Sequence, residues 1–151
     1  MRIWVIRHGD AEWEASSDRE RNLTATGVQE VQSIAGKLDL PEQVAVWHSP
    51  YRRAKQSYEA LSDKLGQHIT RVVEEPLLQP DADVNLLVEL LEAVDEPNVI
   101  LVSHMPLVAL LVRKLTQDQR IGGFQTAQVV EIKDDQEGQW QVEAVYAPSI
   151  K

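Results

Sequence analysis

Three apolar runs without polar alternation mark the chain at residues 3–6, 44–47 and 99–102. Each run indicates a strand that is buried on both faces, as at the centre of a parallel sheet. A stretch with apolar positions at helical spacing follows each run. This alternation of strands and helices is typical of an α/β fold.

Helical spacing of apolar residues predicts four helices. The expected ranges are 25–38, 54–65, 83–94 and 106–115. Thr24 is the expected N-cap of the first helix, and Gly66 is expected at C′ of the second, a position that favours a left-handed glycine. Pro106 suits the first turn of the fourth helix.

The C-terminal part of the chain changes to strand patterns. Residues 127–132 and 140–146 are expected to be strands joined by the polar segment 134–138. The second of them alternates apolar and polar residues, as a strand with one wet face does. A further short strand is expected at residues 71–74. Without repeats, low-complexity tracts or linkers, residues 1–151 are expected to form a single α/β domain with a mostly parallel sheet and an antiparallel C-terminal edge.

Arginine and histidine side chains follow the three apolar runs. Arg7-His8-Gly9-Asp10 comes after the first run, Arg53 follows the second and His104 follows the third. In an open α/β sheet the carboxyl ends of parallel strands meet at the edge that binds ligands. An arginine can clamp phosphoryl oxygens, a histidine can attack phosphorus, and Gly9 lets a ligand or another backbone approach closely. One motif alone favours a solvated arginine and a structural histidine, whereas the convergence of three segments predicts an anion site.

Composition narrows the classes of function. The net charge of −9 argues against a nucleic acid as partner, because phosphate backbones require clustered Lys and Arg. The absence of cysteine excludes disulfides, thiolate catalysis and sulfur-ligated zinc. No apolar stretch approaches the roughly 20 residues that cross a bilayer, and the His8 motif leaves no room for a signal peptide, so we expect a cytoplasmic protein. A site with only His8 and His104 as ligands would lack a carboxylate, and the nearby arginines would repel a cation, so we expect no metal.

These motifs, taken together, carry a resemblance to a known family. The matching segments are Ile6 to Ala11, Arg21 to Thr24 with Gly27, Ser49-Pro50 with Arg53-Ala54 and Gln56-Ser57, Ser103 to Val108, and more weakly Phe124 to Thr126. In their order and spacing they resemble the histidine phosphatase superfamily, and within it the short bacterial phosphohistidine phosphatases of the SixA type. The resemblance covers nearly the whole chain and implies a three-layer fold of the phosphoglycerate mutase type, with helices on both faces of the sheet.

The resemblance also implies roles for individual residues. His8 would be the nucleophile that forms a phosphohistidine intermediate, while Arg7, Arg53 and His104 would surround the phosphoryl oxygens, without a metal or cofactor. Gly9, Ser49 and Met105 would lie beside the substrate. Arg21 would add a contact to it, although a surface salt bridge within residues 18–21 explains this arginine equally well. Among the remaining basic residues, His48 is expected to be a neighbour of the site, whereas His68 and Arg52 are expected to be solvated.

One departure from the family pattern bears on the substrate. Many members use a carboxylate as general acid, but Leu77 or Leu78 stands where that acid is expected. The nearby carboxylates that do not fit the pattern securely are Glu74, Glu75, Asp81 and Asp83. An alcohol leaving group needs a proton donor, whereas the imidazole of phosphohistidine leaves with far less help.

Short connections additionally predict an open site, suited to a phosphorylated side chain on another protein. We therefore expect a monomeric phosphohistidine phosphatase acting on a histidine-phosphorylated phosphotransfer domain or phosphocarrier protein. The alternatives are a phosphomonoesterase for small molecules or phosphoproteins, with Glu75, Asp81 or Asp83 as a mobile acid, and a non-catalytic phosphate-binding module.

Overall fold

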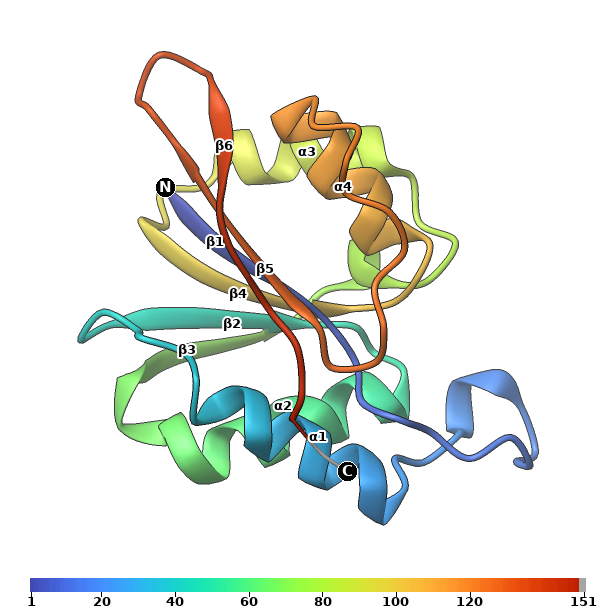
Figure 1. Cartoon of the computed structure of the whole chain (residues 1–151). Helices are drawn as coiled ribbons and strands as arrows, with labels where there is room; N and C mark the ends of the chain where they lie inside the picture. Colours follow the sequence, from blue (N-terminus) through green and yellow to red (C-terminus); the bar gives the residue numbers. More distant parts are fainter. Residues whose placement is uncertain (150–151) are drawn as a thin grey trace.

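A computed structural model describes residues 1–149 of the protein (Figure 1). Within these residues six strands and four α-helices alternate up to β5 and β6, which follow each other directly, and three short 3-10 turns lie between the earlier elements. The strands are β1 (Arg2–Arg7), β2 (Val44–His48), β3 (Ile69–Glu74), β4 (Asn98–Ser103), β5 (Val129–Asp134) and β6 (Trp140–Tyr146). The helices are α1 (Ala25–Ala35), α2 (Arg52–Leu65), α3 (Val84–Ala93) and α4 (Leu107–Thr116), and the 3-10 turns are η1 (Asp18–Glu20), η2 (Gly66–His68) and η3 (Pro76–Leu78).

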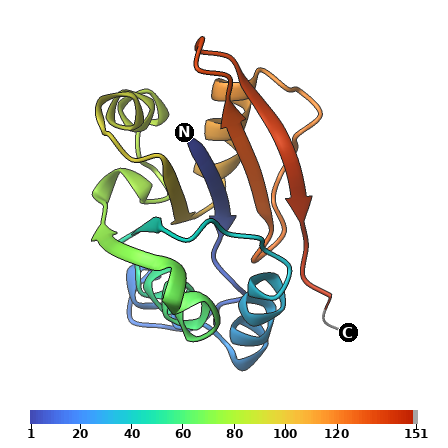
Figure 2. The ribbon, with the colours of Figure 1, turned by 90° about the vertical axis from the view of Figure 1, so that its left-hand side faces the viewer.

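The six strands form one sheet in the order β3-β2-β4-β1-β5-β6. Strands β1 to β4 pair in parallel, whereas β5 is antiparallel to both β1 and β6. Figure 2 shows β5 and β6 at one side of the molecule and β3 at the other. The prediction of a mostly parallel sheet with an antiparallel C-terminal edge is therefore confirmed.

Helices cover both faces of the sheet, which gives the three layers visible in Figure 1. Successive side chains of β1 point to opposite faces, so Trp4 and Ile6 pack with α1 and α2. Ile3 and Val5 pack with α3 and α4 on the other face. The unbroken apolar run at the start of the chain thus supplies both halves of the core, as a central strand must.

Two helix ends differ from the sequence prediction. Helix α1 ends at Ala35, and Leu38 packs against the core from the loop that follows. Gly66 caps α2 with a right-handed φ of −55°, so the expectation of a left-handed C′ glycine is wrong. The chain continues directly into η2 at this point, and a 3-10 turn needs no residue of positive φ.

Two strand boundaries also differ from the sequence prediction. Strand β3 begins at Ile69, earlier than predicted, and β5 begins at Val129 rather than at residue 127. Ala127 has a left-handed φ of 58°, a conformation that no strand residue adopts. Its N–H donates to the carbonyl of His8 over 3.0 Å, so this turn joins the C-terminal segment to the histidine motif.

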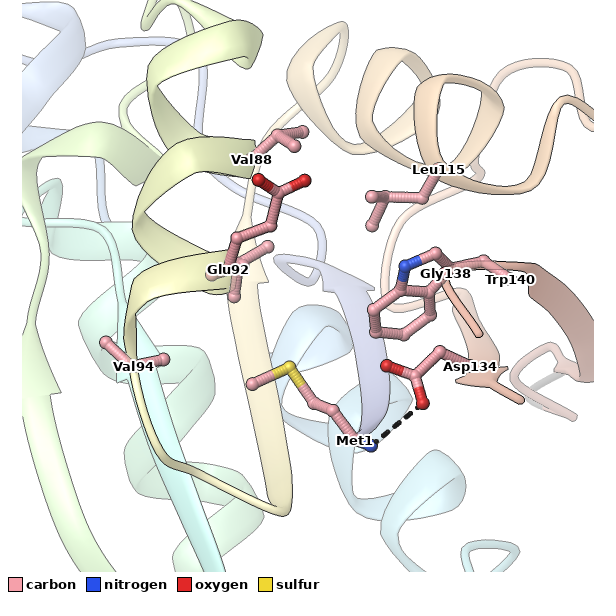
Figure 3. Close-up of a pocket in the computed structure, with 9 residues that line it drawn as sticks. Met1, Val88, Glu92, Val94, Leu115, Asp134, Gly138 and Trp140 are labelled. Carbon is pink, nitrogen blue, oxygen red and sulfur yellow. Dashed lines mark hydrogen bonds and ion pairs between the residues drawn. The ribbon is translucent and has the colours of Figure 1, made fainter. Parts of the chain in front are cut away.

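The amino end of β1 borders a cavity of about 370 Å³ between α3, α4 and the β5–β6 hairpin (Figure 3). Val88 and Glu92 line it from α3, and Leu115 and Trp140 line it from the opposite side. The amino group of Met1 lies 3.2 Å from a carboxylate oxygen of Asp134 at its floor. Within residues 1–149, no helix combines the length and apolar character needed to cross a membrane.

Candidate active site

The parallel strands β1, β2 and β4 bring the three predicted segments to one edge of the sheet. Arg7 pairs with Ser103 in the sheet register, and His48 pairs with Val102. The N–H of His8 donates to the carbonyl of Ser103 over 3.0 Å, which continues this register beyond the strands. The segments that follow the three strands are thus fixed side by side by backbone hydrogen bonds.

The imidazole of His8 is buried and has a defined tautomer. Its Nδ1 lies 2.7 Å from the carbonyl oxygen of Gly9. Since a carbonyl only accepts, Nδ1 carries the proton and Nε2 carries the lone pair. Burial lowers the pKa of His8 to about 4; the Gly9 carbonyl opposes this shift, and the charges of Arg53 and Arg7 add to it. His8 is therefore neutral at pH 7, with the nitrogen that can attack an electrophile unprotonated.

Arg53 lies in the first turn of α2 and is only 4% exposed. Its Nε lies 3.3 Å from His8 Nε2, which accepts this hydrogen bond through its lone pair. Its Nη1 donates to the carbonyl of Asp18 over 2.6 Å, and its Nη2 lies 3.2 Å from the Asp18 carboxylate. These contacts hold the guanidinium in one orientation against the nucleophilic edge of the histidine.

Arg7 ends β1 beside this pair. Its Nη1 donates to the carbonyl of Phe124 over 2.7 Å, whereas its buried Nε has no hydrogen-bond partner among the described residues. Burial lowers the pKa of Arg7, and the charge of Arg53 lowers it further. A guanidinium remains protonated in spite of such shifts, so positive charge is concentrated next to His8.

His104 faces His8 from the end of β4, with 5.1 Å between the two ring centroids. Its Nε2 lies 2.7 Å from Ser49 Oγ, which also accepts the N–H of Tyr51. Burial lowers the pKa of His104 to about 2; repulsion from His8, which is protonated only at such low pH, and the charge of Arg53 add to this shift. The ring is therefore neutral, and its buried Nδ1 has no partner in the described part of the chain.

Gly9 serves the packing of the histidine motif. A Cβ at this position would lie 2.6 Å from the carbonyl oxygen of Gly27 in α1. The Gly9 N–H donates to Ser57 Oγ over 3.0 Å, so this amide is already engaged. Of the two reasons considered for a glycine here, the structure shows the close approach of another backbone.

The structure places Arg21 and Met105 at the border of the site. Arg21 donates to the carbonyl of Glu12 over 2.6 Å and forms an ion pair of 3.0 Å with Asp18, the salt bridge considered as an alternative role. The sulfur of Met105 accepts the N–H of Phe124 over 3.4 Å. Phe124 therefore contacts both Arg7 and Met105, which explains why the weakly matching C-terminal segment belongs to the site.

Three other basic residues were expected to lie outside the site. His48 is buried, stacks on Tyr58 and lies with its Nδ1 2.9 Å from the carbonyl of Ser49, so it neighbours the site as predicted. Arg52 is exposed, as predicted. His68 is half-buried and lies with its Nδ1 2.9 Å from the carbonyl oxygen of Pro41, so its side chain is only partly solvated.

Two of the carboxylates that follow β3 accept hydrogen bonds from nearby backbone N–H groups. Glu75 accepts the N–H of Leu77 over 2.9 Å, and Asp83 caps α3 by accepting the N–H of Asn85 over 2.8 Å. The carboxylate that contacts the site is Asp18, which sequence reasoning missed. Its only local signal is its position in the same charged run as Arg21, and its contact with α2 depends on the path of the loop.

The described residues, 1–149, contain no group of three His, Asp or Glu side chains close enough together to hold a metal ion. The arrangement instead offers a neutral imidazole beside the guanidiniums of Arg53, which is buried, and Arg7, which is half-buried. Such a site suits a tetrahedral oxyanion, because planar guanidinium groups recognise phosphoryl oxygens.

The sequence model of the histidine phosphatase superfamily (branch 1) matches residues 3–79. The chain belongs to this superfamily. Phosphohistidine phosphatase SixA of Escherichia coli (strain K12) is 34% identical over 146 residues, which cover 91% of this chain and 88% of that protein. A SixA homolog of Haemophilus influenzae is 24% identical over 143 residues, which cover 87% of each chain.

A solved structure of the same type extends this likeness to the fold. The protein histidine phosphatase SixA in complex with tungstate superposes with a TM-score of 0.87 at 30% identity, covering 98% of this chain and 97% of that one. The expected three-layer fold of the superfamily is thereby confirmed. The residues that the superfamily model matches, 3–79, comprise β1, α1, β2, α2 and β3. This part of the chain carries His8 and Arg53.

Proposed function

We propose that this histidine phosphatase removes the phosphoryl group from a histidine-phosphorylated protein through a phosphohistidine intermediate on His8. One observation carries the proposal. His8 is held as a neutral imidazole whose Nε2 lone pair is unprotonated and lies beside the guanidinium of Arg53. A nucleophile in this state can attack phosphorus without first losing a proton.

In the first step Nε2 of His8 attacks the phosphorus, so that a new N–P bond forms as the N–P bond of the substrate breaks. The substrate imidazole departs with the bonding electron pair and takes up one proton from water, so that it leaves as a neutral imidazole. In the second step a water molecule attacks the phosphohistidine and releases inorganic phosphate, which restores the neutral His8. No redox partner is needed in either step.

Arg7, Arg53 and His104 would stabilise the charge on the equatorial oxygens during both transfers. Two buried atoms without partners, Arg7 Nε and His104 Nδ1, support this role. If the Ser49 hydroxyl donates to His104 Nε2, Nδ1 carries the proton and becomes a donor for a phosphoryl oxygen. The tungstate complex of SixA supports the same interpretation, since tungstate is also an oxyanion.

The choice of phosphohistidine as substrate rests on the leaving group. Leu78 is fully buried where the family's acid was expected, and its carbonyl accepts the hydroxyl of Ser103 over 2.7 Å. The carboxylate that does contact the site, Asp18, is ion-paired with Arg53 and Arg21. A site of this kind favours a leaving group that needs little protonation. The names of both SixA relatives, phosphohistidine phosphatases, agree with this choice.

We further propose that residues 1–151 form a single domain that acts as a cytoplasmic monomer, independently of metal ions. One chain supplies all four proposed catalytic groups, His8, Arg7, Arg53 and His104, and its arginines provide the charge that a metal would otherwise supply. Sedimentation of the active protein and fractionation of cells test the oligomeric state and the location.

The decisive experiment concerns His8. We expect His8→Ala to lower the hydrolysis of a histidine-phosphorylated phosphotransfer domain by about 10⁴-fold or more, the scale for loss of a nucleophile. Labelled phosphate should be trapped on His8 of the wild-type protein when the reaction is stopped without acid. His68→Gln is the matched control and should keep full activity. Substantial turnover by His8→Ala would overturn the assignment.

A further inference from the structure

Trp13 is the most conspicuous apolar side chain on the surface near the site. It is 86% exposed and lies in the loop between β1 and α1, ahead of η1. Burial of an indole removes a large apolar area from water, and the folded chain gains almost none of it here. Tryptophan is also among the residues that contribute most to protein–protein binding, so its exposure beside a site indicates an interaction surface.

A continuous series of contacts leads from Trp13 to the nucleophile. The guanidinium of Arg21 lies 4.8 Å from the centre of a Trp13 ring and is ion-paired with Asp18 at 3.0 Å. Asp18 in turn contacts Arg53, whose Nε lies 3.3 Å from His8 Nε2. Trp13 is thus linked to the site through the side chains of Arg21, Asp18 and Arg53, while its own ring remains exposed to solvent.

Beside the ring lies a hollow of about 300 Å³ that is lined by Trp13, Ala15, Ser17, Asp18 and Arg21. The two charged members of this lining already form an ion pair with each other. What the hollow offers to a new partner is therefore the exposed indole of Trp13 and the methyl group of Ala15, with the hydroxyl of Ser17 beside them. This surface suits an apolar side chain better than a second phosphate or a free ion.

We propose that Trp13 and this hollow dock the phosphoprotein by receiving an apolar side chain that lies next to its phosphohistidine. The inference rests on the proposed function, because the phosphoryl group must enter the adjoining cage while the protein that carries it covers the rim. It assigns to Trp13 a contribution to substrate affinity and none to the chemical step. A small phosphorylated molecule that fills only the cage would not reach the indole.

The test compares two substrates, a histidine-phosphorylated phosphotransfer domain and p-nitrophenyl phosphate. Trp13→Ala should lower kcat/KM for the phosphoprotein about tenfold or more, through KM, as expected for loss of an aromatic contact at an interface. Hydrolysis of p-nitrophenyl phosphate should stay within about twofold. Trp13→Phe should retain most of the activity towards the phosphoprotein. Leu110→Ala, which removes a 43% exposed side chain from α4, is the matched control and should behave as wild type.

Unchanged phosphoprotein turnover in Trp13→Ala would overturn the docking role and leave the proposed function standing. Equal losses on both substrates would also overturn it, because Trp13 would then act by positioning Arg21. If the wild-type protein hydrolyses p-nitrophenyl phosphate but not the phosphoprotein, the proposed function fails, and the docking role fails with it.

Discussion

The positively charged groups at the two ends of the central sheet differ in how they are paired with carboxylates. At the amino end of β1 two cations have carboxylate partners: the amino group of Met1 lies 3.2 Å from Asp134, and Arg2 lies 2.8 Å from Glu131. At the carboxyl end Arg7 and Arg53 lie beside two neutral histidines; Asp18 pairs with Arg53, whereas Arg7 forms no ion pair with a described residue. The cations of Met1 and Arg2 are thus neutralised by direct partners, whereas the guanidinium of Arg7 lies next to His8 without one.

This difference in charge pairing indicates the position of the active site better than the position of the large cavity does. The cavity of about 370 Å³ lies at the amino end, where apolar side chains such as Val88 and Leu115 line it together with the carboxylates of Glu92 and Asp134 (Figure 3). Buried charge without a counterion, and buried donors without acceptors, lower the stability of a fold. They are retained where a ligand completes them, and at the carboxyl end an oxyanion would do so.

Removal of the arginines or of His104 from the carboxyl end should therefore greatly reduce activity. We expect Arg7→Ala, Arg53→Ala and His104→Ala each to lower kcat/KM by about 100-fold or more, the scale for loss of one preorganised donor. Assays of phosphohistidine hydrolysis by purified variants measure this, and EDTA should have no effect on the wild-type protein.

The controls for this prediction come from both ends of the sheet. Arg52→Ala removes the exposed neighbour of Arg53 and should leave kcat/KM within about twofold. Arg2→Ala breaks the pair with Glu131 and should lower the free energy of unfolding by about 1 kcal/mol without changing the rate. A strict need for an added divalent metal would show that the arginines are not the source of the charge stabilisation.

The neutral histidines make the carboxyl end sensitive to acid. The pKa is lowered to about 4 for His8 and to about 2 for His104, whereas the unfolded chain has values near 6.5. Below pH 6.5 the unfolded state therefore binds more protons than the folded state, and stability falls as the pH falls. Between pH 7 and pH 5 each histidine should account for a loss of about 2 kcal/mol.

Urea unfolding at pH 7 and pH 5 measures this dependence. His104→Gln should lose about 2 kcal/mol less than the wild-type protein over this interval, whatever its stability at pH 7. Leu110→Ala, which removes an exposed side chain that does not titrate, should keep the wild-type dependence. Identical losses in the wild-type protein and His104→Gln would mean that His104 is not held neutral by burial.

The sequence was sufficient to predict the sheet and the meeting of its strand ends, because buried strands are apolar over their whole length. It also predicted the Thr24 cap, which accepts the N–H of Gly27 over 3.0 Å. These are local signals. The left-handed Ala127 had none, since alanine has no preference for that conformation.

The electrostatics of the site could not be read from residue types. The tautomer of His8 is set by the carbonyl of Gly9, and the orientation of Arg53 is set by a loop far from it in sequence. The choice between a ligand and a backbone neighbour for Gly9 was likewise decided by tertiary packing against Gly27. The sequence was sufficient to identify the side chains of the site, whereas tertiary packing determines their protonation states and orientations.

The smallest expected effects concern the carboxylates around the site. Burial raises the pKa of Asp18, but hydrogen bonds from Arg21 and the charge of Arg53 outweigh this and hold the pKa below its usual value. Asp18 is therefore ionised at pH 7 and has no proton to give to a leaving group. The proposed hydrolysis of phosphohistidine needs no such donor, so loss of any carboxyl group after β3 should matter little.

We accordingly expect changes of no more than about threefold in phosphohistidine hydrolysis for the variants Glu74→Gln, Glu75→Gln, Asp81→Asn and Asp83→Asn, because a true general acid contributes at least about 100-fold. The amide of Asp83→Asn can still cap α3, so this variant should also remain folded. The wild-type protein should hydrolyse phosphohistidine faster than p-nitrophenyl phosphate, and p-nitrophenyl phosphate faster than an alkyl phosphate, in the order in which the leaving groups need protonation. A loss of orders of magnitude in one of the four variants would reveal a mobile acid, and a phosphomonoesterase would then be the better description of this site.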